Sequence, residues 1–310
     1  MPAVSVVLPV FNGQPYLDSA VRSLLAQTLS DFEMIVVDDG STDDSLAILG
    51  RFARQDSRLR IIMRRNTGIE AALNEAIDTS RSEFIARMDS DDLAMPDRLQ
   101  TQLDYLKSHD RVVLLGGAYR LIDDAGRYLT TIIPPTSNEL LQELALSGRN
   151  PFCHPLVMMR REAVIRVGGY FSDLPAAEDL DLWLRMGEIG EMSCIRTVLL
   201  DYRLHASSIS EDKQAAQIES MRLACLRACA RRGIQREFKG SDPWRPSLAR
   251  NSRHQFALRY GWWAFKNRQR ATSLVYGAKA IAINPFKADG WRLLACAALK
   301  GFERAEQSSS

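Results

Sequence analysis

Short apolar segments alternate with helical segments over the first ninety residues, and this alternation constrains the fold more than any other feature of the sequence. The apolar segments cover residues 4–10, 34–37, 60–63 and 83–86. Apolar side chains recur at helical spacing in the segments between them, residues 16–27, 45–54 and 69–79. This order predicts parallel β-α-β units with right-handed crossovers, and nearly continuous apolar strands predict a sheet that helices cover on both faces.

Two acidic loops follow strands of this predicted sheet. Asp38 and Asp39 come after residues 34–37, and a second group comes after residues 83–86. Ligands of open α/β sheets bind beyond the carboxyl ends of the strands. We therefore expect the loops at residues 9–13, 38–43 and 89–92 to gather at one edge of the sheet.

The second acidic loop contains Asp89, Asp91 and Asp92 within four residues. Like charges this close repel one another, and a fold tolerates them best when a cation or hydrogen-bond donors share the site. Oxygen ligands suit Mg²⁺ or Mn²⁺ better than zinc. The alternative is a solvated turn whose acids cap the helix that follows Met95.

The carboxyl-terminal part of the chain is strongly basic. Residues 244–304 contain twelve Lys or Arg against Asp289 and Glu303, a balance of +10, which leaves −8 for the rest because the total is +2. Four of the five tryptophans also lie there. Basic amphipathic helices with Trp suit an anionic membrane surface, so we expect peripheral membrane contact through this segment. The alternative is a helical appendage with its basic face in solvent.

Length and composition indicate one large domain and an appendage. A chain of 310 residues can bury a sizeable core. We expect a first domain at residues 1–210 and a helical basic region at residues 211–310. No apolar run approaches the roughly 20 residues of a membrane span, and Met1 runs directly into the first strand, so we expect a cytoplasmic protein, or one peripheral at the inner face of the membrane. No nucleic-acid-binding module accompanies the basic charge, so we expect no nucleic-acid partner.

Five motifs together resemble those of family 2 inverting glycosyltransferases. The loops at residues 9–12, 37–41 and 89–92 resemble the nucleotide-binding loops of that family. Asn66-Thr67-Gly68 resembles the segment beside the nucleotide, and residues 177–185 resemble the Glu-Asp motif on the acceptor side. The resemblance covers residues 3–210. It implies a GT-A fold, which is an α/β fold with one Rossmann-like, mainly parallel sheet flanked by helices, here with a carboxyl-terminal helical appendage.

The resemblance also implies a donor site. The residues expected to bind the nucleotide-sugar are Pro9, Val10, Asn12, Asp39, Asn66, Gly68, Asp89, Ser90 and Asp91. Asp39 resembles the carboxylate that accepts a hydrogen bond from the base, which favours uracil; the alternative is a turn residue that bonds to its own loop. The residues expected to hold Mn²⁺ or Mg²⁺ are Asp91, Asp92 and His205.

On the acceptor side, the resemblance implies that Asp179 is the catalytic base. Acids are favoured in the first turn of a helix, so the alternative is a capping role, and that position would lower the pKa of a base. The residues expected on the acceptor or diphosphate side are His154, Glu178, Arg203 and Ser208. His154 and His205 have the common alternative of hydrogen-bonded packing residues.

The resemblance implies an enzyme that transfers a sugar, with inversion, from a nucleoside-diphosphate sugar to a hydroxyl group. The expected donor is a UDP-sugar. The expected acceptor is a glycan or a lipid-linked molecule in bacterial cell-surface glycan synthesis. One alternative is a nucleotidyltransferase, although residues 9–16 lack the Gly-rich basic loop of such enzymes. Another is a non-catalytic protein that binds a nucleotide-sugar or a glycan. The chain has neither a Gly-x-Gly-x-x-Gly fingerprint nor a Walker A loop, which disfavours dehydrogenases and P-loop ATPases.

Overall fold

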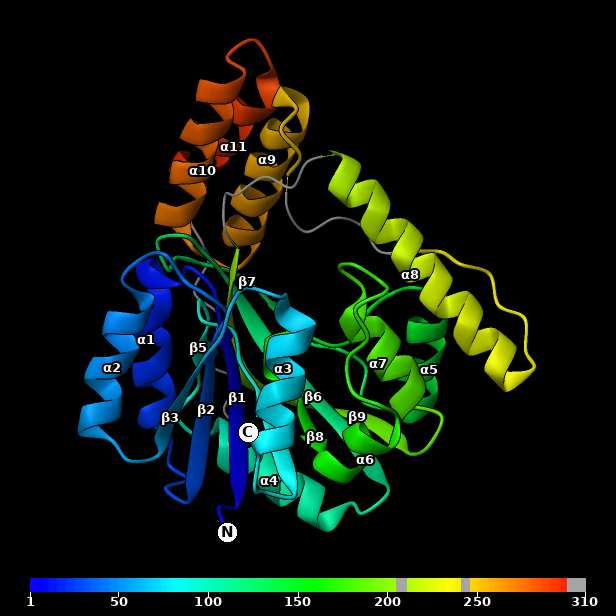
Figure 1. The fold of residues 1–310 in the computed structure, drawn as a ribbon. Helices are drawn as coiled ribbons and strands as arrows, with labels where there is room; N and C mark the ends of the chain where they lie inside the picture. The colour runs from blue at the N-terminus through cyan, green and yellow to red at the C-terminus, as the bar shows by residue number, and fades with distance from the viewer. Residues whose placement is uncertain (205–210, 241–245, 300–310) are drawn as a thin grey trace, which may run out of the picture. The chain divides into compact units, whose positions relative to one another are not determined.

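The structure, a computed structural model, describes residues 1–204, 211–240 and 246–299, and only the backbone of residues 211–214. The described strands form one nine-stranded sheet (Figure 1). Its parallel strands and the helices that connect them are β1 (Val4–Val10), α1 (Gln14–Leu25), β2 (Phe32–Asp38), α2 (Ser45–Gln55), β3 (Leu59–Met63), α3 (Ile69–Thr79) and β4 (Phe84–Arg87). β1 pairs in parallel with β2 and β4, and β2 with β3, which confirms the predicted β-α-β units.

The apolar character of the parallel strands follows from their cover. Every residue of β2 is buried, and β1 is buried at all positions except Pro9, which is partly exposed. α1 contributes Leu17 and Leu24 to the core, and α3 contributes Leu73 and Ile77. Figure 1 shows α1 and α2 together and α3 apart from them across β1 and β2, as a sheet with helices on both faces requires.

Antiparallel strands continue the sheet beyond β4. The elements of this half are β5 (Leu93–Ala94), α4 (Arg98–Ser108), β6 (Val112–Asp123), β7 (Tyr128–Ile132), α5 (Asn138–Leu146), η1 (His154–Leu156), β8 (Met158–Arg160), α6 (Arg161–Arg166), α7 (Glu178–Met186) and β9 (Glu191–Leu204). β8 lies between β4 and β6 and is antiparallel to both. The apolar run at residues 156–159 predicts a strand there, but β8 begins only at Met158, because Pro155 removes a ladder donor and the chain forms a turn of 3-10 helix at His154–Leu156.

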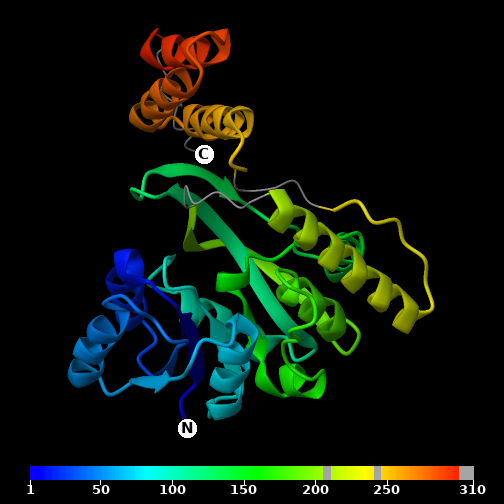
Figure 2. The ribbon, with the colours of Figure 1, turned by 45° about the horizontal axis from the view of Figure 1, so that its top comes forward.

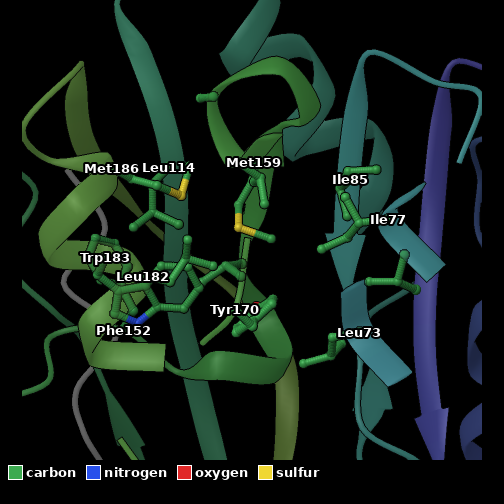
Figure 3. Close-up of a cluster of buried hydrophobic side chains, with 14 of the residues drawn as sticks. Leu73, Ile77, Ile85, Leu114, Phe152, Met159, Tyr170, Leu182, Trp183 and Met186 are labelled. Atoms are coloured by element: carbon green, nitrogen blue, oxygen red, sulfur yellow. The ribbon is translucent and has the colours of Figure 1, made fainter. Parts of the chain in front are cut away.

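A core cluster joins α3, the middle of the sheet and α7 (Figure 3). Trp183 of α7 is fully buried, and its ring meets that of Phe152 edge to face with centroids 5.9 Å apart. Leu114 of β6 and Met159 of β8 belong to the same cluster. This packing fixes α7 against the sheet, and therefore fixes the position of the two acids at the beginning of α7.

The chain divides into two compact units, and each contains more than one segment. The first unit consists of residues 1–119, 132–202 and 214–242, and the second of residues 120–131, 203–213 and 243–310. The division predicted after residue 210 stays a prediction. Among the helices that the structure describes, none has both the length and the apolar character that a bilayer crossing requires.

The helices after β9 belong to both units. α8 (Glu211–Arg232) packs Ala224 and Cys225 against Leu180 and Leu184 of α7 in the first unit. The second unit contains α9 (Arg250–Lys266), α10 (Arg270–Ile283) and α11 (Ala288–Leu299), which pack on one another (Figure 2). The helical appendage that the sequence predicts is therefore present.

Candidate functional site

The loops that follow β1 and β2 are fastened together by hydrogen bonds. The backbone N–H of Asn12 donates to Ser41 Oγ at 3.0 Å, and the N–H of Thr42 donates to Asn12 Oδ1 at 2.8 Å. Asn12 has a φ of 51°, a conformation that Asn adopts more readily than most residues. The structure thus brings Pro9, Val10 and Asn12 together with the acidic loop after β2, because β1 and β2 end side by side.

Asp39 joins a third loop to this edge. Its N–H donates to the carbonyl of Val10 at 2.8 Å, and its buried carboxylate accepts the N–H of Thr67 at 3.1 Å and of Gly68 at 3.0 Å. The Arg64 guanidinium lies 3.2 Å from the same carboxylate. Asp39 therefore bonds to the loop after β3 rather than only to its own turn, and this places the exposed Asn66 and the half-buried Gly68 beside it.

Gly40 is required where these loops approach one another. Its φ is 80°, in the left-handed region, and a Cβ at this position would lie 2.9 Å from the backbone nitrogen of Asn66. A side chain would both strain the backbone and push the loop after β3 away. The close approach thus depends on the absence of a side chain at Gly40.

The acidic loop after β4 forms a compact carboxylate cluster. Asp89, Asp91 and Asp92 each offer one oxygen, and these oxygens lie within 4.8 Å of one another. Asp92 is fully buried, whereas Asp89 and Asp91 are half-buried. Ser90 lies against the first loop, because a Cβ on Gly13 would be 3.0 Å from its hydroxyl. Three convergent carboxylate oxygens fit a divalent ion that prefers oxygen ligands.

Two buried arginines lie beside this cluster, and the sequence analysis missed both. Arg87 is 2% exposed, and its Nη1 lies 2.6 Å from Asp89 Oδ2. Arg98 is fully buried, and its Nη2 donates to the carbonyl of Arg87 at 2.6 Å. Burial lowers the pKa of Arg98 to about 10, whereas Asp89 raises the pKa of Arg87 against the effect of burial. Both side chains therefore remain cations at neutral pH and offset the negative charge of the cluster.

The predicted acceptor-side acids occupy the first two positions of α7. Asp179 Oδ1 accepts the N–H of Leu180 at 2.6 Å, and Oδ2 accepts the side-chain amide of Asn150 at 2.5 Å. Asn150 orients this carboxylate, a role that the sequence had not indicated for it. Both Glu178 and Asp179 are half-buried.

Burial decides the protonation of this pair. Burial raises the pKa of Glu178 to about 8, and the charges of Asp179 and Glu70 add to the increase. Burial also raises the pKa of Asp179, although Leu180 and Asn150 donate hydrogen bonds to it. The lowering expected from the helix amino terminus is therefore outweighed. Arg87 lowers the pKa of both acids, so its charge acts on the cluster after β4 and on the acids of α7.

His154 lies in the same unit and makes packing contacts. Its Nε2 is 2.9 Å from the hydroxyl of Tyr170, and its ring meets Trp183 edge to face at 5.6 Å. Burial lowers its pKa well below the usual value, so the ring is neutral at physiological pH. Asn74 holds the backbone of Tyr170 through two hydrogen bonds, at 2.8 and 2.9 Å. These contacts match those of a hydrogen-bonded packing residue.

Arg203 belongs to the second unit, where its Nη1 donates to the carbonyls of Asp123 at 3.2 Å and Asp124 at 3.4 Å. It thus holds the turn of the β6–β7 hairpin. His205 and Ser208, which we expected near the metal and the diphosphate, lie outside the described residues.

The sheet topology and the acids beyond its parallel strands define a glycosyltransferase of the GT-A type. Residues 5–168 match the family described as Glycosyl transferase family 2, and the chain belongs to this family. The protein is therefore a transferase. These findings confirm the predicted family and fold class.

Three known proteins illustrate the similarity. The O-antigen biosynthesis glycosyltransferase WbnJ of Escherichia coli is 32% identical over 218 residues, which cover 68% of this chain and 84% of the relative. TarS residues 1–349 of S. aureus, solved with UDP-GlcNAc, align with a TM-score of 0.57 and 16% identity over 96% of this chain and 90% of that one. The mannosyltransferase PcManGT of Pyrobaculum calidifontis, solved with GDP-Man and Mn²⁺, aligns with a TM-score of 0.52 and 20% identity over 97% and 81%.

Proposed function

We propose that the protein transfers a sugar, with inversion, from a UDP-sugar to a hydroxyl group of a bacterial cell-surface glycan. The observation that carries this proposal is the convergence of three carboxylate oxygens after β4, in the same unit as the half-buried acid pair at the start of α7. Such groups suit the departing diphosphate and the attacking hydroxyl, respectively. The E. coli relative is named for O-antigen biosynthesis, and the S. aureus structure contains UDP-GlcNAc, which supports the substrate classes.

In this proposal the donor lies across the carboxyl ends of β1, β2 and β4. The loops fastened by Asn12 and Asp39 receive the nucleoside, and Asp39 accepts a hydrogen bond from the base. This requires Asp39 to exchange one of its present bonds to Thr67 and Gly68. The remaining residues proposed to contact the nucleotide-sugar are Pro9, Val10, Asn66, Gly68, Asp89, Ser90 and Asp91.

Asp91 and Asp92 would hold Mn²⁺ or Mg²⁺. When bound, the ion would act as a Lewis acid that stabilises the charge of the departing diphosphate. The convergence of the carboxylate oxygens supports this assignment, as does the Mn²⁺ in the mannosyltransferase structure. Arg87 and Arg98 keep the cluster folded by offsetting part of its charge.

Asp179 would accept the proton of the acceptor hydroxyl. Inversion requires this hydroxyl to attack from the face opposite the leaving group, and the attack needs a base at the acceptor side. The pKa of Asp179 is raised by burial, and a base works best when its pKa is close to the operating pH. Asn150 orients the carboxylate, Glu178 binds or orients the acceptor, and His154, packed on Tyr170, lies on the same side.

The metal assignment is tested by nucleotide binding. Asp91→Ala should abolish the increase in UDP affinity that Mn²⁺ produces, measured by calorimetry, because the variant loses a ligand of the ion. Asp97→Ala, which removes an exposed acid at the start of α4, is the matched control and should behave as the wild type. Unchanged Mn²⁺ dependence in Asp91→Ala would contradict the assignment.

The reaction class is tested by its products. Incubation with UDP-sugars should release UDP. A nucleotidyltransferase would instead release pyrophosphate when it is given UTP and a sugar 1-phosphate, and a non-catalytic binding protein would release neither product. Asp179→Asn should bind donor normally and transfer the sugar at least about 100-fold more slowly, the usual scale for a lost general base. Near-normal transfer would show that Asp179 only caps α7.

We also propose that the protein works at the inner face of the membrane, where its basic carboxyl-terminal segment, residues 244–304, would hold it near a glycan or lipid-linked acceptor. Residues 244, 245 and 300–304 of this segment lie outside the described residues. The charge of the described part supports the proposal, and sedimentation with vesicles tests it.

A further inference from the structure

The three helices of the second unit carry a large excess of positive charge. Residues 246–299 contain nine Lys or Arg against a single acid, Asp289, a balance of +8. The β6–β7 hairpin segment of the same unit, residues 120–131, has two arginines and two aspartates and adds no net charge. An anionic surface would therefore be attracted to the helices rather than to the hairpin.

Hydrogen bonds assemble one end of this unit, where α9 and α11 begin and α10 ends. Arg250 Nε donates to the carbonyl of Ile283 at 2.6 Å, and Lys287 Nζ donates to Asn251 Oδ1 at 3.4 Å. Trp291 Nε1 donates to the carbonyl of Pro285 at 3.0 Å, which holds the indole against the loop between α10 and α11. We call this end the aromatic tip and define it by Leu248, Arg250, Phe286, Lys287 and Trp291.

Large apolar side chains of the aromatic tip are exposed to solvent. Phe286 is 96% exposed, Leu248 69% and Trp291 53%. Within the same unit Phe256 and Tyr276 are buried, so apolar residues are not exposed throughout the unit. Leaving a Phe side chain in water forfeits about 1.5–3 kcal/mol of burial. The protruding side chains therefore gain when another apolar phase covers them.

We propose that the aromatic tip inserts into an anionic lipid bilayer and anchors the enzyme there through Phe286 and Trp291. This inference rests on the proposed function, because it states how the transferase reaches a membrane-bound acceptor. Aromatic side chains with a polar group, such as Trp, favour the membrane interface, and basic residues near it are attracted to anionic headgroups. Arg250 and Lys287 supply that attraction at the tip.

A bilayer fits this surface better than a protein partner does. The apolar groups protrude from the ends of helices, and a bilayer can admit them singly, whereas a protein must offer a matching pocket. The charge also favours lipid, since headgroups attract cations at many positions and need no individual pairing. The acyl chains of an anionic bilayer are therefore the expected environment of the nearly fully exposed Phe286 side chain.

Sedimentation of the full-length protein with vesicles tests the proposal. Vesicles of phosphatidylcholine with phosphatidylglycerol should bind the protein at about 0.1 M salt, and binding should weaken as salt screens the basic residues. The variant with Phe286→Ser and Trp291→Ser should bind at least about tenfold more weakly, because two apolar insertions are lost. The variant with Arg250→Gln and Lys287→Gln should bind more weakly than the wild type to vesicles that contain phosphatidylglycerol, and as the wild type does to vesicles of phosphatidylcholine only.

Matched control variants distinguish insertion of the aromatic tip from nonspecific adsorption of exposed apolar or basic side chains to vesicles. Leu299→Ser removes a side chain that is 83% exposed at the far end of α11, and Arg54→Gln removes an exposed cation from α2; both should bind as the wild type. Equal weakening by Leu299→Ser, or failure of the wild type to bind at low salt, would overturn the proposal. So would tip-dependent self-association in the absence of lipid.

The donor reaction distinguishes this proposal from the proposed function. The variant with Phe286→Ser and Trp291→Ser should keep Mn²⁺-dependent UDP binding and UDP release, since both belong to the first unit. Loss of vesicle binding with retained UDP release supports the anchor. Vesicle binding by a protein that releases no UDP would refute the transferase while leaving the anchor intact.

Discussion

Replacing Glu178 by Gln should stabilise the protein in alkaline solution and not in acid. Burial raises the pKa of Glu178 from 4.5 to about 8, so the folded state holds a proton that the unfolded state has released over this interval. Wild-type stability therefore falls as pH rises from about 4.5 to about 8. Below this interval both states are protonated and no penalty exists, whereas above it the ionised carboxylate must stay half-buried beside Asp179.

The magnitude follows from the size of the shift. A rise from 4.5 to about 8, at about 1.4 kcal/mol for each pKa unit, sets an upper limit of about 5 kcal/mol. Solvent reaches this half-buried carboxylate and screens it, so we expect about 2–3 kcal/mol. For a unit of this size, each kcal/mol changes Tm by about 2–4 °C, so Glu178→Gln should melt several degrees higher than the wild type at pH 9.

Thermal unfolding at pH 5, 7 and 9 measures this effect without substrate. Glu162→Gln is the matched control, because Glu162 is an exposed acid in the first turn of α6. The reasoning is refuted if Glu178→Gln changes Tm equally at pH 5 and pH 9, or if Glu162→Gln gives the same pH-dependent gain.

Two further predictions concern buried side chains. Arg87→Met should move the acid limb of the rate profile to higher pH, because its charge lowers the pKa of both Glu178 and Asp179; an unmoved profile in a folded variant would contradict this role. Trp183→Ala should lower the free energy of unfolding by about 3–5 kcal/mol in denaturant titrations, because it empties a fully buried position, and a loss under about 1 kcal/mol would show that the core refills the space.

The strands and helices that end at polar loops could be predicted closely from the sequence. The predicted bounds of β1 and α3 agree with the structure, because an apolar run at β1 and Gly68 before α3 mark their limits clearly. The antiparallel half was harder to predict. An apolar run indicates a strand near β8, but β8 has only three residues and its partners β4 and β6 are distant in sequence, so no local pattern indicates its pairing.

The sequence was sufficient to predict the acidic residues of the site, but not the residues that support them. Asp89, Asp91 and Asp92 stand out because three carboxylates are adjacent to a strand. Arg87 and Asn150 do not, because their importance depends on burial and on partners that tertiary structure brings to them. An arginine at the end of an otherwise apolar segment was the one available signal for Arg87.

The β6–β7 hairpin has a consequence for anyone who exchanges parts between related enzymes. The Tyr276 hydroxyl donates to Asp123 at 3.0 Å, and the side-chain amide of Asn267 donates to the carbonyl of Leu129 at 3.3 Å. The hairpin is therefore hydrogen-bonded to residues of α10 and of the end of α9, which lie more than one hundred positions later in the sequence. A chimera that takes only its carboxyl-terminal helices from a relative would lose the hydrogen bond between Tyr276 and Asp123 wherever the relative has another residue in place of Tyr276. The unit that can be exchanged as a whole is discontinuous in sequence, and residues 120–131 must be exchanged together with the carboxyl-terminal helices.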